Sequence, residues 1–362
     1  MYTNPKKICA IAGDSVADEF FWPIVDTIEA MNLSLEWVKP VLEGDMPGWI
    51  PLSAVKGAID GCDATIYGFS KKYEGIFTYL KWGKRTYAHI RPVKHIPGCP
   101  SPLKNAEKID YIIVRENMES MYPGLEGDIK ELAGLTIRDW KMNLPLDVSK
   151  EGKYALKIIT VENTKNIAHY ACKVALKRKK NGFPGKVTCA TKSIMLKLSD
   201  GLFRSIVEET VKQYPELSYE HFSIDDISHQ LVSRPKNFDV IVVPNMYGDI
   251  LGDIGAATVG GLETAPRAAI GDSYAYFDSL LQTQASICGK NIVNPTGMYL
   301  SAAMMLEYLG FEKEAVKWEN AIRAIYSEGK YLTKDKGGNA STSDFCKAAK
   351  EKILGSDSNN YS

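Results

Sequence analysis

The sequence predicts an α/β fold, and three observations support this prediction. Short apolar, β-branched runs of strand length alternate along the chain with segments in which apolar residues recur at helical spacing. The chain has 362 residues, of which 45% are hydrophobic, so it can bury a substantial core without disulfide bonds. No fixed-period repeat interrupts the alternation. Strands that alternate with helices favour a parallel sheet covered on both faces, in one large unit or in two domains.

The first third of the chain shows the alternation most clearly. Apolar residues at helical spacing predict helices at residues 18–31 and 51–61. Runs of apolar and β-branched residues predict strands at residues 7–12, around 35–38 and at 64–68. This order of elements is typical of the beginning of a parallel sheet with crossover helices.

The remainder of the chain continues the pattern after one irregular stretch. Residues 128–162 have weak helical periodicity, and we interpret them as a β-rich arm. The other expected elements are strands at 111–115, 185–190, around 221–224 and at 240–243, and helices at 166–180, 199–214, about 297–308 and 312–328. The last two helices complete the predicted fold, and the polar tail 355–362 is expected to fray.

The composition excludes several classes of protein. Because 44 basic residues balance 44 acidic residues, we expect no general nucleic-acid-binding surface. The N-terminus has no apolar signal region, and no apolar run approaches the length of a membrane helix. The seven cysteines are odd in number and include no Cys-x-x-Cys pair, which indicates reduced thiols and a cytoplasmic protein.

One stretch, residues 239–253, combines a strand with two aligned carboxylates. An apolar run at Val240–Val243 is followed by Gly248, where we expect a sharp turn, and the first turn of a helix would then hold Asp249 and Asp253. Residues four apart lie on one helical face, so both carboxylates would point in one direction. A divalent cation that prefers oxygen, Mg²⁺ or Mn²⁺, would relieve their repulsion. Alternatively, the helix N-terminus favours acidic residues through its dipole alone.

The same stretch resembles the signature of the β-decarboxylating dehydrogenases, the isocitrate, isopropylmalate and tartrate dehydrogenases. The matching residues are Asn245-Met-Tyr-Gly-Asp-Ile-Leu-Gly-Asp253, then Val259-Gly-Gly-Leu and Ala265-Pro. The resemblance extends across nearly the whole chain. It implies an isopropylmalate-dehydrogenase-like fold with a mixed central sheet and two domains, a large one at 1–101 plus 255–362 and a small one at 102–254. The arm in the small domain would join two copies into a homodimer, with the active site between the domains.

The resemblance also implies an acid–base apparatus. Asp225 corresponds to a third metal carboxylate, which in the family the neighbouring subunit supplies. Lys192 and Tyr122 correspond to the catalytic lysine and tyrosine: the lysine would take or relay the proton of the substrate hydroxyl, and the tyrosine would protonate the enol left by decarboxylation. Taken without the resemblance, Asp225 is also consistent with a helix N-cap, Lys192 with a surface lysine and Tyr122 with a half-buried tyrosine.

Three cationic residues correspond to the family's carboxylate-binding arginines and imply a small carboxylic-acid substrate. Arg91 and Arg115 would hold carboxylates with a planar fork of donors. The third arginine is replaced by Lys81, which keeps the charge and loses the fork. Arg91 is also consistent with a charged residue at a strand end. The positions that select the substrate's side group match neither the isocitrate nor the isopropylmalate pattern: Gly75, Phe77 and Thr78.

The cofactor-binding segments depart furthest from the family pattern. Relatives read His-Gly-Ser/Thr-Ala-Pro-Asp-Ile-Ala-Gly-Lys where this chain reads Leu281-Gln-Thr-Gln-Ala-Ser-Ile-Cys-Gly-Lys290. Ser286 replaces the acid that would pair with the ribose hydroxyls of NAD, and no basic residue stands there to indicate NADP. Gly289 and Asn294 persist, so the expected cofactor contacts are Ser286, Gly289 and Asn294, with NAD or NADP in an altered pocket.

Three functions are consistent with this pattern. The first is the oxidative decarboxylation of a malate-type 2-hydroxy di- or tricarboxylic acid with NAD(P) and a divalent metal. The second is a redox-neutral, metal-dependent decarboxylase or lyase that has lost dinucleotide binding. The third is a non-catalytic subunit on the same fold. Because Tyr122, Lys192 and the three aspartates are all present, the sequence weighs against the third function.

Overall fold

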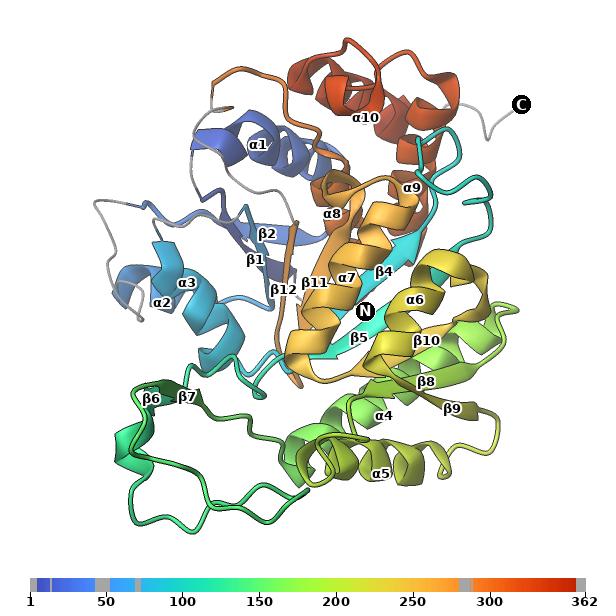
Figure 1. Cartoon of the computed structure of the whole chain (residues 1–362). Helices are drawn as coiled ribbons and strands as arrows, with labels where there is room; N and C mark the ends of the chain where they lie inside the picture. Colours follow the sequence, from blue (N-terminus) through green and yellow to red (C-terminus); the bar gives the residue numbers. More distant parts are fainter. Residues whose placement is uncertain are drawn as a thin grey trace.

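The computed structural model describes residues 5–13, 15–42, 53–68, 73–279, 287 and 289–355. A ten-stranded sheet forms its centre, in the order β2-β1-β3-β12-β11-β4-β5-β10-β8-β9 (Figure 1). The strands are β1 (Lys6–Ile11), β2 (Leu35–Val38), β3 (Ala64–Tyr67), β4 (Ala88–Lys94), β5 (Asp110–Glu116), β8 (Lys186–Thr191), β9 (Ser218–Ser223), β10 (Val240–Val243), β11 (Pro266–Ile270) and β12 (Ala275–Ser279). β4 pairs antiparallel with β5, and β11 pairs antiparallel with both β4 and β12. The sheet is therefore mixed, as the resemblance implies, and the wholly parallel sheet that the alternation favours is wrong.

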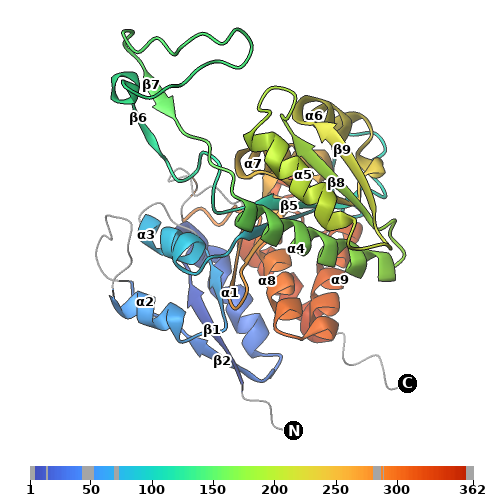
Figure 2. The same ribbon diagram turned by 90° about the horizontal axis from the view of Figure 1, so that it is seen from below.

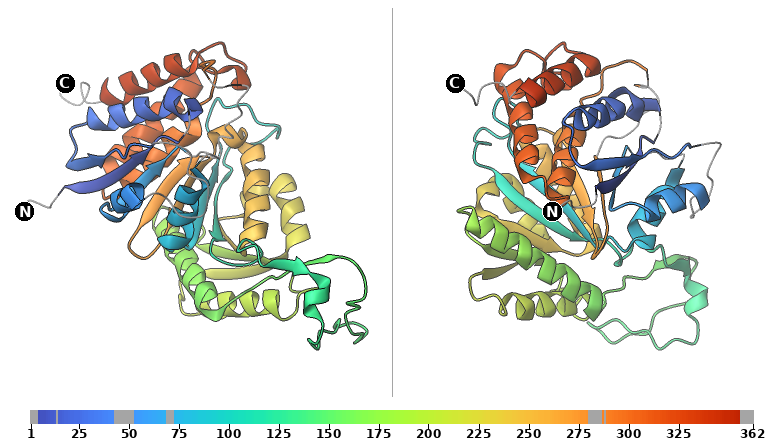
Figure 3. Two further views of the ribbon diagram at one scale, coloured as in Figure 1. Left: turned by 90° about the vertical axis from the view of Figure 1, so that its left-hand side faces the viewer. Right: turned by 180° about the vertical axis from the view of Figure 1, so that it is seen from behind.

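Helices cover both faces of the sheet (Figures 1 and 3). They are α1 (Ser15–Glu29), α2 (Ser53–Asp60), α3 (Glu74–Thr78), a π-helical turn (Tyr79–Gly83), α4 (Val161–Lys180), α5 (Ser199–Val211), α6 (Ile224–Ser233), α7 (Asn245–Val259), α8 (Thr296–Tyr308), α9 (Glu312–Glu328) and α10 (Thr342–Gly355). Most expected elements lie within a few residues of their predicted positions. The sequence analysis predicts no strand at β4, β11 or β12 and no helix at α3, α6 or α10.

The two faces of the sheet differ in polarity. α1, α4, α5, α8, α9 and α10 pack on one face, over one continuous apolar core. The other face carries two separate apolar clusters, one beneath α2 and α3 and one beneath α6 and α7. On the four central strands of this face, five polar side chains alternate with residues of the continuous core: His89, Arg91, Arg115, Arg267 and Asp278. We call these five residues the polar strip. They also explain why three central strands are hard to predict, since β4, β11 and β12 lack an apolar run.

Helix α7 begins four residues earlier than the sequence analysis predicts. It starts at Asn245, and Gly248 lies inside it rather than at a sharp turn. A Cβ atom on Gly248 would lie 2.7 Å from Cβ and Cγ of Arg115. Gly248 is therefore required by close packing of the helix against β5, which the sequence alone does not distinguish from a turn. Asp249 and Asp253 still share one helical face because their separation is four residues.

The arm projects from the rest of the molecule (Figure 2). Its only paired strands among the described residues are the short β6 (Glu126–Asp128) and β7 (Lys153–Ala155), so most of the predicted β-rich arm is irregular. The arm ends before residue 162 because α4 begins at Val161, where Thr160 Oγ1 accepts the amide hydrogen of Asn163 and caps the helix. Ten large apolar side chains of the arm region are exposed: Leu125, Leu135, Ile137, Trp140, Met142, Leu144, Leu146, Leu156, Ile158 and Val161.

The predicted domain division falls between two hydrogen-bonded strands. β1 to β4, β11 and β12 belong to the predicted large domain, and β5 and β8 to β10 to the small one, so the boundary in the sheet is the β4–β5 pair. Residue 254, the second predicted crossing, lies within α7. Six cysteines are buried and free in the described part of the chain. Among the described helices, none combines the length and the apolar composition that a membrane crossing requires.

Candidate active site

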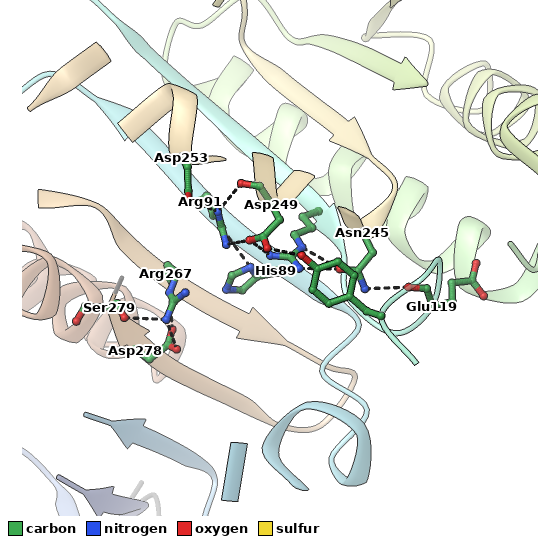
Figure 4. Close-up of polar contacts among 11 residues, drawn as sticks. His89, Arg91, Glu119, Asn245, Asp249, Asp253, Arg267, Asp278 and Ser279 are labelled. Atoms are coloured by element: carbon green, nitrogen blue, oxygen red, sulfur yellow. Dashed lines mark hydrogen bonds and ion pairs between the residues drawn. The ribbon is translucent and has the colours of Figure 1, made fainter. Parts of the chain in front are cut away.

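The two predicted carboxylate-binding arginines lie side by side on the polar strip. Arg91 on β4 and Arg115 on β5 are both almost fully buried. In the antiparallel pair of β4 and β5, His89 lies opposite Arg115 and Arg91 lies opposite Ile113. Buried guanidinium groups are costly unless they are paired, so this strip requires acceptors from an element that packs over it. Helix α7 supplies them (Figure 4).

Asp249 on α7 receives both arginines. Arg91 Nη2 donates to Asp249 Oδ1 at 2.5 Å, and Arg115 Nη1 donates to the same oxygen. Arg91 Nη1 also donates to Asp253 Oδ1 at 3.0 Å, so this one guanidinium joins both predicted metal carboxylates. Burial alone would raise the pKa of Asp249, but Arg115 and Arg91 lower it to about 2. Asp249 is therefore an anion at every physiological pH.

Tyr122 completes the cluster from the segment that follows β5. Its hydroxyl donates to Asp249 Oδ2, and its ring faces the Arg115 guanidinium, 4.8 Å from the ring centroid. Burial and the hydrogen bond to Asp249 raise the pKa of Tyr122 to about 12. The phenol thus stays protonated at neutral pH and can serve as a proton donor.

Lys81, on the π-helical turn, also lies close to the Tyr122 ring. Its Nζ atom lies 4.8 Å from the Tyr122 ring centroid and 4.4 Å from that of Trp82. Lys81 is only 2% exposed, and its ammonium has no hydrogen-bond or ion-pair partner among the described residues. Burial and the nearby Arg115 lower the pKa of Lys81 to about 7. A buried ammonium without an acceptor is a ready site for an anionic group of a ligand.

The structure adds site residues that the sequence analysis did not single out. Asn245 Oδ1 accepts from Arg115 Nε at 3.0 Å and Nη2 at 2.7 Å, and Asn245 Nδ2 donates to the carbonyl of Glu119 at 3.1 Å. His89 accepts from Arg91 Nε at 3.4 Å, and burial with the nearby Arg91 holds its pKa well below the usual value. Asn245 is the first residue of the family signature, so the sequence pattern could have identified it as a site residue. His89 stands in a strand with no such signal.

A second buried ion pair extends the polar strip toward the end of β12. Arg267 donates to both carboxylate oxygens of Asp278, at 3.0 Å from Nε and 2.6 Å from Nη2, and Nη2 also donates to the carbonyl of Ser279 at 2.7 Å. Nothing in the sequence pattern indicated this pair. This pair balances its own charges, as Arg91 and Arg115 balance Asp249 and Asp253, so Lys81 is the cation of the cluster that has no acceptor among the described residues.

Lys192 and Asp225 contact each other, and within the described residues neither contacts Asp249, Asp253 or Tyr122. Lys192 Nζ forms an ion pair with Asp225, whose carboxylate also accepts from Ser223 Oγ at 2.8 Å. The side chain of Asp225 is 66% exposed, so it points into solvent and not into the core. The residue that precedes helix α6 is Ser223, which excludes Asp225 as the N-cap. Within the described part of this single chain, no three His, Cys, Asp or Glu side chains are placed to hold a metal.

The residues present fit a divalent metal that prefers oxygen. Asp249 and Asp253 project from one helical face and share Arg91, which compensates their charge. The remaining ligands would have to come from Asp225 of a second copy and from substrate oxygens. Carboxylate oxygens alone match Mg²⁺ or Mn²⁺ rather than a metal that prefers sulfur or nitrogen.

The expected cofactor contacts are described only in part. Ser286 lies outside the described residues. Gly289 has φ +71°, so a turn that favours glycine accounts for it. The buried amide of Asn294 is engaged inside the fold: Nδ2 donates to Tyr326 Oη at 3.2 Å and to Asp335 Oδ2 at 3.0 Å. Neither residue presents a donor set that identifies a nucleotide.

Comparison with known proteins supplies the family. The model of the isocitrate/isopropylmalate dehydrogenase family matches residues 52–349. The 3-isopropylmalate/3-methylmalate dehydrogenase of Methanocaldococcus jannaschii is 36% identical over 354 residues, which cover 96% of this chain and 98% of that protein. One regulatory subunit of the NAD isocitrate dehydrogenase of Dictyostelium discoideum is 34% identical, over 96% and 92% of the two chains. The crystal structure of isocitrate dehydrogenase from Methylococcus capsulatus superposes with a TM-score of 0.80 at 26% identity, over 96% and 99% of the chains.

Proposed function

This chain belongs to the isocitrate/isopropylmalate dehydrogenase family, and on that premise we propose that it catalyses the metal-dependent oxidative decarboxylation of a malate-type 2-hydroxy di- or tricarboxylic acid with NAD or NADP. The observation that carries the proposal is the convergence on Asp249. Two buried arginines and the Tyr122 hydroxyl all donate to this one carboxylate, which lies four residues from Asp253. A structural ion pair needs one cation, whereas this arrangement gathers cations, a proton donor and two candidate metal ligands.

The charges of the cluster favour a substrate with two or more carboxylates. Arg91, Arg115 and Lys81 are buried cations, and only the arginines have acceptors among the described residues. A dianionic acid would bring one carboxylate to the guanidinium forks and another to the Lys81 ammonium. A neutral substrate would leave the Lys81 ammonium buried and unpaired when it is protonated, which is costly.

The chain's own residues supply the proton transfers of the proposed reaction. When bound, a divalent cation would polarise the oxygen on the substrate's second carbon, and a nicotinamide would accept the hydride. Arg91 and Arg115 hold the carboxylates, so that the one β to the new carbonyl departs as carbon dioxide. Lys192 takes the proton of the substrate hydroxyl, and Tyr122 returns a proton to the carbon that lost the carboxylate.

The same proposal includes a homodimer with a shared site. Lys192 contacts Asp225, whereas Tyr122 contacts Asp249, and no contact joins the two pairs within the described part of one chain. The exposed apolar side chains of the arm would be covered by a second copy. Mixing inactive Tyr122→Phe and Lys192→Met proteins would then restore activity, because mixed dimers contain one intact site. Mixed dimers without any activity would exclude the shared site.

The test of the reaction is its stoichiometry. The protein, with Mg²⁺ or Mn²⁺, is incubated with malate, 3-methylmalate, 3-isopropylmalate, isocitrate or tartrate and either NAD⁺ or NADP⁺. We expect one acid to release carbon dioxide and reduced nucleotide in equal amounts, and neither product to form after chelation of the metal. Asp249→Asn, which keeps the size of the side chain, should abolish both products.

A redox-neutral decarboxylase is the second candidate, and the altered segment 281–290 favours it. It would release carbon dioxide from a 3-oxo acid without any nucleotide and would form none of the reduced nucleotide with the 2-hydroxy acids. If neither product appears with any acid, the non-catalytic subunit is the remaining function. Two of the relatives are named regulatory subunits.

A further inference from the structure

A buried ion pair between Asp200 and Lys157, where the arm ends, contacts the backbone of Lys192. Asp200, at the start of α5, is fully buried, and one of its carboxylate oxygens forms an ion pair with Lys157. Its other oxygen accepts the backbone amide hydrogen of Lys192 at 2.7 Å. Lys157 Nζ also donates to Tyr247 Oη at 3.3 Å and lies 4.4 Å from the Tyr247 ring centroid. The side chain of Lys157 is 8% exposed and that of Asp200 is 0% exposed, so solvent competes little for this ion pair.

The network fixes the backbone of Lys192 on both sides. While Asp200 accepts its N–H group, the carbonyl of Lys192 accepts the amide hydrogens of Met195 and Leu196, both at 2.9 Å. Residues 192–198 form the turn between β8 and α5. Because the side chain of a lysine has four rotatable carbons, the position of its ammonium depends on how firmly its backbone is held.

Three separate segments meet in this network. Lys157 belongs to the last residues of the arm, Asp200 to the first turn of α5, and Tyr247 to the first turn of α7. Tyr247 is two residues from Asn245, which holds Arg115. A single buried carboxylate thus joins the arm, the Lys192 turn and the helix that carries the Asp249 cluster.

We propose that Asp200, whose buried carboxylate is paired with Lys157, is a positioning residue that sets the location of the Lys192 ammonium for proton transfer. The inference deepens the proposed function and rests on it for the role of Lys192. A positioning residue acts through another group, so its loss lowers kcat and leaves substrate affinity unchanged.

The test compares two double variants, Lys157→Met with Asp200→Asn and Lys157→Met with Asp200→Leu. Both lack the ion pair, and they differ only in the side chain at position 200. Asp200→Asn retains a carbonyl oxygen that can accept from the Lys192 amide, whereas Asp200→Leu does not. We expect the leucine variant to lose roughly 10- to 100-fold in kcat with KM for the acid unchanged, and the asparagine variant to retain most of its kcat. Equal kcat losses in the two variants would overturn the inference.

A matched buried pair and a labelling experiment complete the test. Arg178 and Asp239 form another buried ion pair, and Asp239 also accepts backbone amides of Gly185 and Lys186, so Asp239→Asn with Arg178→Met controls for lost stability. The labelling rate of Lys192 with acetic anhydride, measured by mass spectrometry against exposed Lys212, reports its position without any reaction. We expect this rate to rise in the leucine variant alone. An unchanged rate would overturn the inference. A raised rate in a protein that oxidises no acid would uphold the positioning and reject the proposed function.

Discussion

The Asp249 cluster and the segment that precedes helix α8, with Gly289 and Asn294, teach different lessons about what a sequence retains. In the Asp249 cluster, the side chains that the family signature identifies converge on one carboxylate and contact one another directly. At the other region, the residues that persist are explained by the fold. Asn294 is engaged by Tyr326 and Asp335, and Gly289 has a positive φ. A matching residue is evidence for a ligand only where packing does not already account for it.

The residues of the Asp249 cluster are therefore stronger evidence for ligand binding than Gly289 and Asn294, the residues that persist in the cofactor segment. Arg91 and Arg115 are buried charges on a sheet face, where apolar residues could be buried at a lower cost in free energy. Asn294, in contrast, satisfies buried donors and acceptors of the fold, so its presence needs no nucleotide. The predictions below test the two regions separately.

The largest expected effect is in the Asp249 cluster. Tyr122→Phe removes the proposed proton donor, the hydroxyl that donates to Asp249, and keeps the ring that lies near Arg115 and Lys81. We expect kcat to fall about 10²- to 10⁴-fold, the usual contribution of general acid catalysis. Steady-state kinetics measure it. Tyr154→Phe on the arm is the control, since its hydroxyl contacts only Glu131 at 3.4 Å among the described residues, and equal losses in both variants would contradict the assignment.

The second prediction concerns Asn294. Asn294→Ala removes the oxygen that accepts the buried amide hydrogen of Thr296 at 3.1 Å, and it removes one of the donors to Asp335. The free energy of unfolding should fall by about 1–3 kcal/mol, measured by denaturant titration, while NAD⁺ affinity stays the same. A tenfold loss of NAD⁺ affinity at unchanged stability would instead assign Asn294 to the cofactor.

The third prediction restores a missing charge in the cofactor region. Ser286→Asp provides an acceptor for ribose hydroxyls, and a hydrogen bond to a charged group is typically worth about 1.5–3 kcal/mol. NAD⁺ should therefore bind roughly tenfold more tightly or better in calorimetric titration. Ser286→Asn is the neutral control. If both variants bind NAD⁺ as the unmodified protein does, the nucleotide is held elsewhere or not at all.

The smallest expected effect is a pH dependence that arises from Lys81. Its pKa of about 7 means that the ammonium is charged below neutrality and loses its charge above it, whereas Arg91, with a pKa of about 10, stays charged. KM for the acid should therefore rise roughly three- to tenfold between about pH 6.5 and about pH 8.5. Lys81→Arg, which keeps its charge, should remove most of this rise.

A second buried group could titrate in the same range and needs its own control. Burial raises the pKa of Glu116 to about 7, although the amide hydrogens of Met118 and Glu119 stabilise its anion. If Glu116→Gln removes the pH dependence and Lys81→Arg does not, Lys81 is not the titrating group.

The fold was predictable wherever one physical pattern dominates an element. Val240–Val243 is buried on both sides of the sheet and is uniformly apolar, so its strand is evident. β11 and β12 contain Arg267 and Asp278 of the polar strip. These charged residues interrupt the apolar runs by which a strand is recognised in a sequence. The start of α7 was misplaced because Gly248 serves helix packing, a tertiary contact that the local sequence cannot reveal.

The candidate site was predictable in its residues and not in its contacts. The family resemblance identifies Asp249, Tyr122, Arg91 and Arg115. It does not show that the last three side chains all donate to Asp249. Nor does it show the buried pair of Asp200 and Lys157 behind Lys192, since these residues are 43 positions apart. Such contacts depend on how strands and helices pack and are fixed only in the folded chain.

The most direct test of the contrast between the two regions is isothermal titration of the unmodified protein with each ligand separately. The acid that the stoichiometry experiment selects should bind tightly in the presence of Mg²⁺, and Arg115→Met should abolish this binding. The unmodified protein should bind NAD⁺ at least roughly tenfold more weakly than the Ser286→Asp variant does. Micromolar binding of NAD⁺ to the unmodified protein, with no gain from Ser286→Asp, would contradict the account.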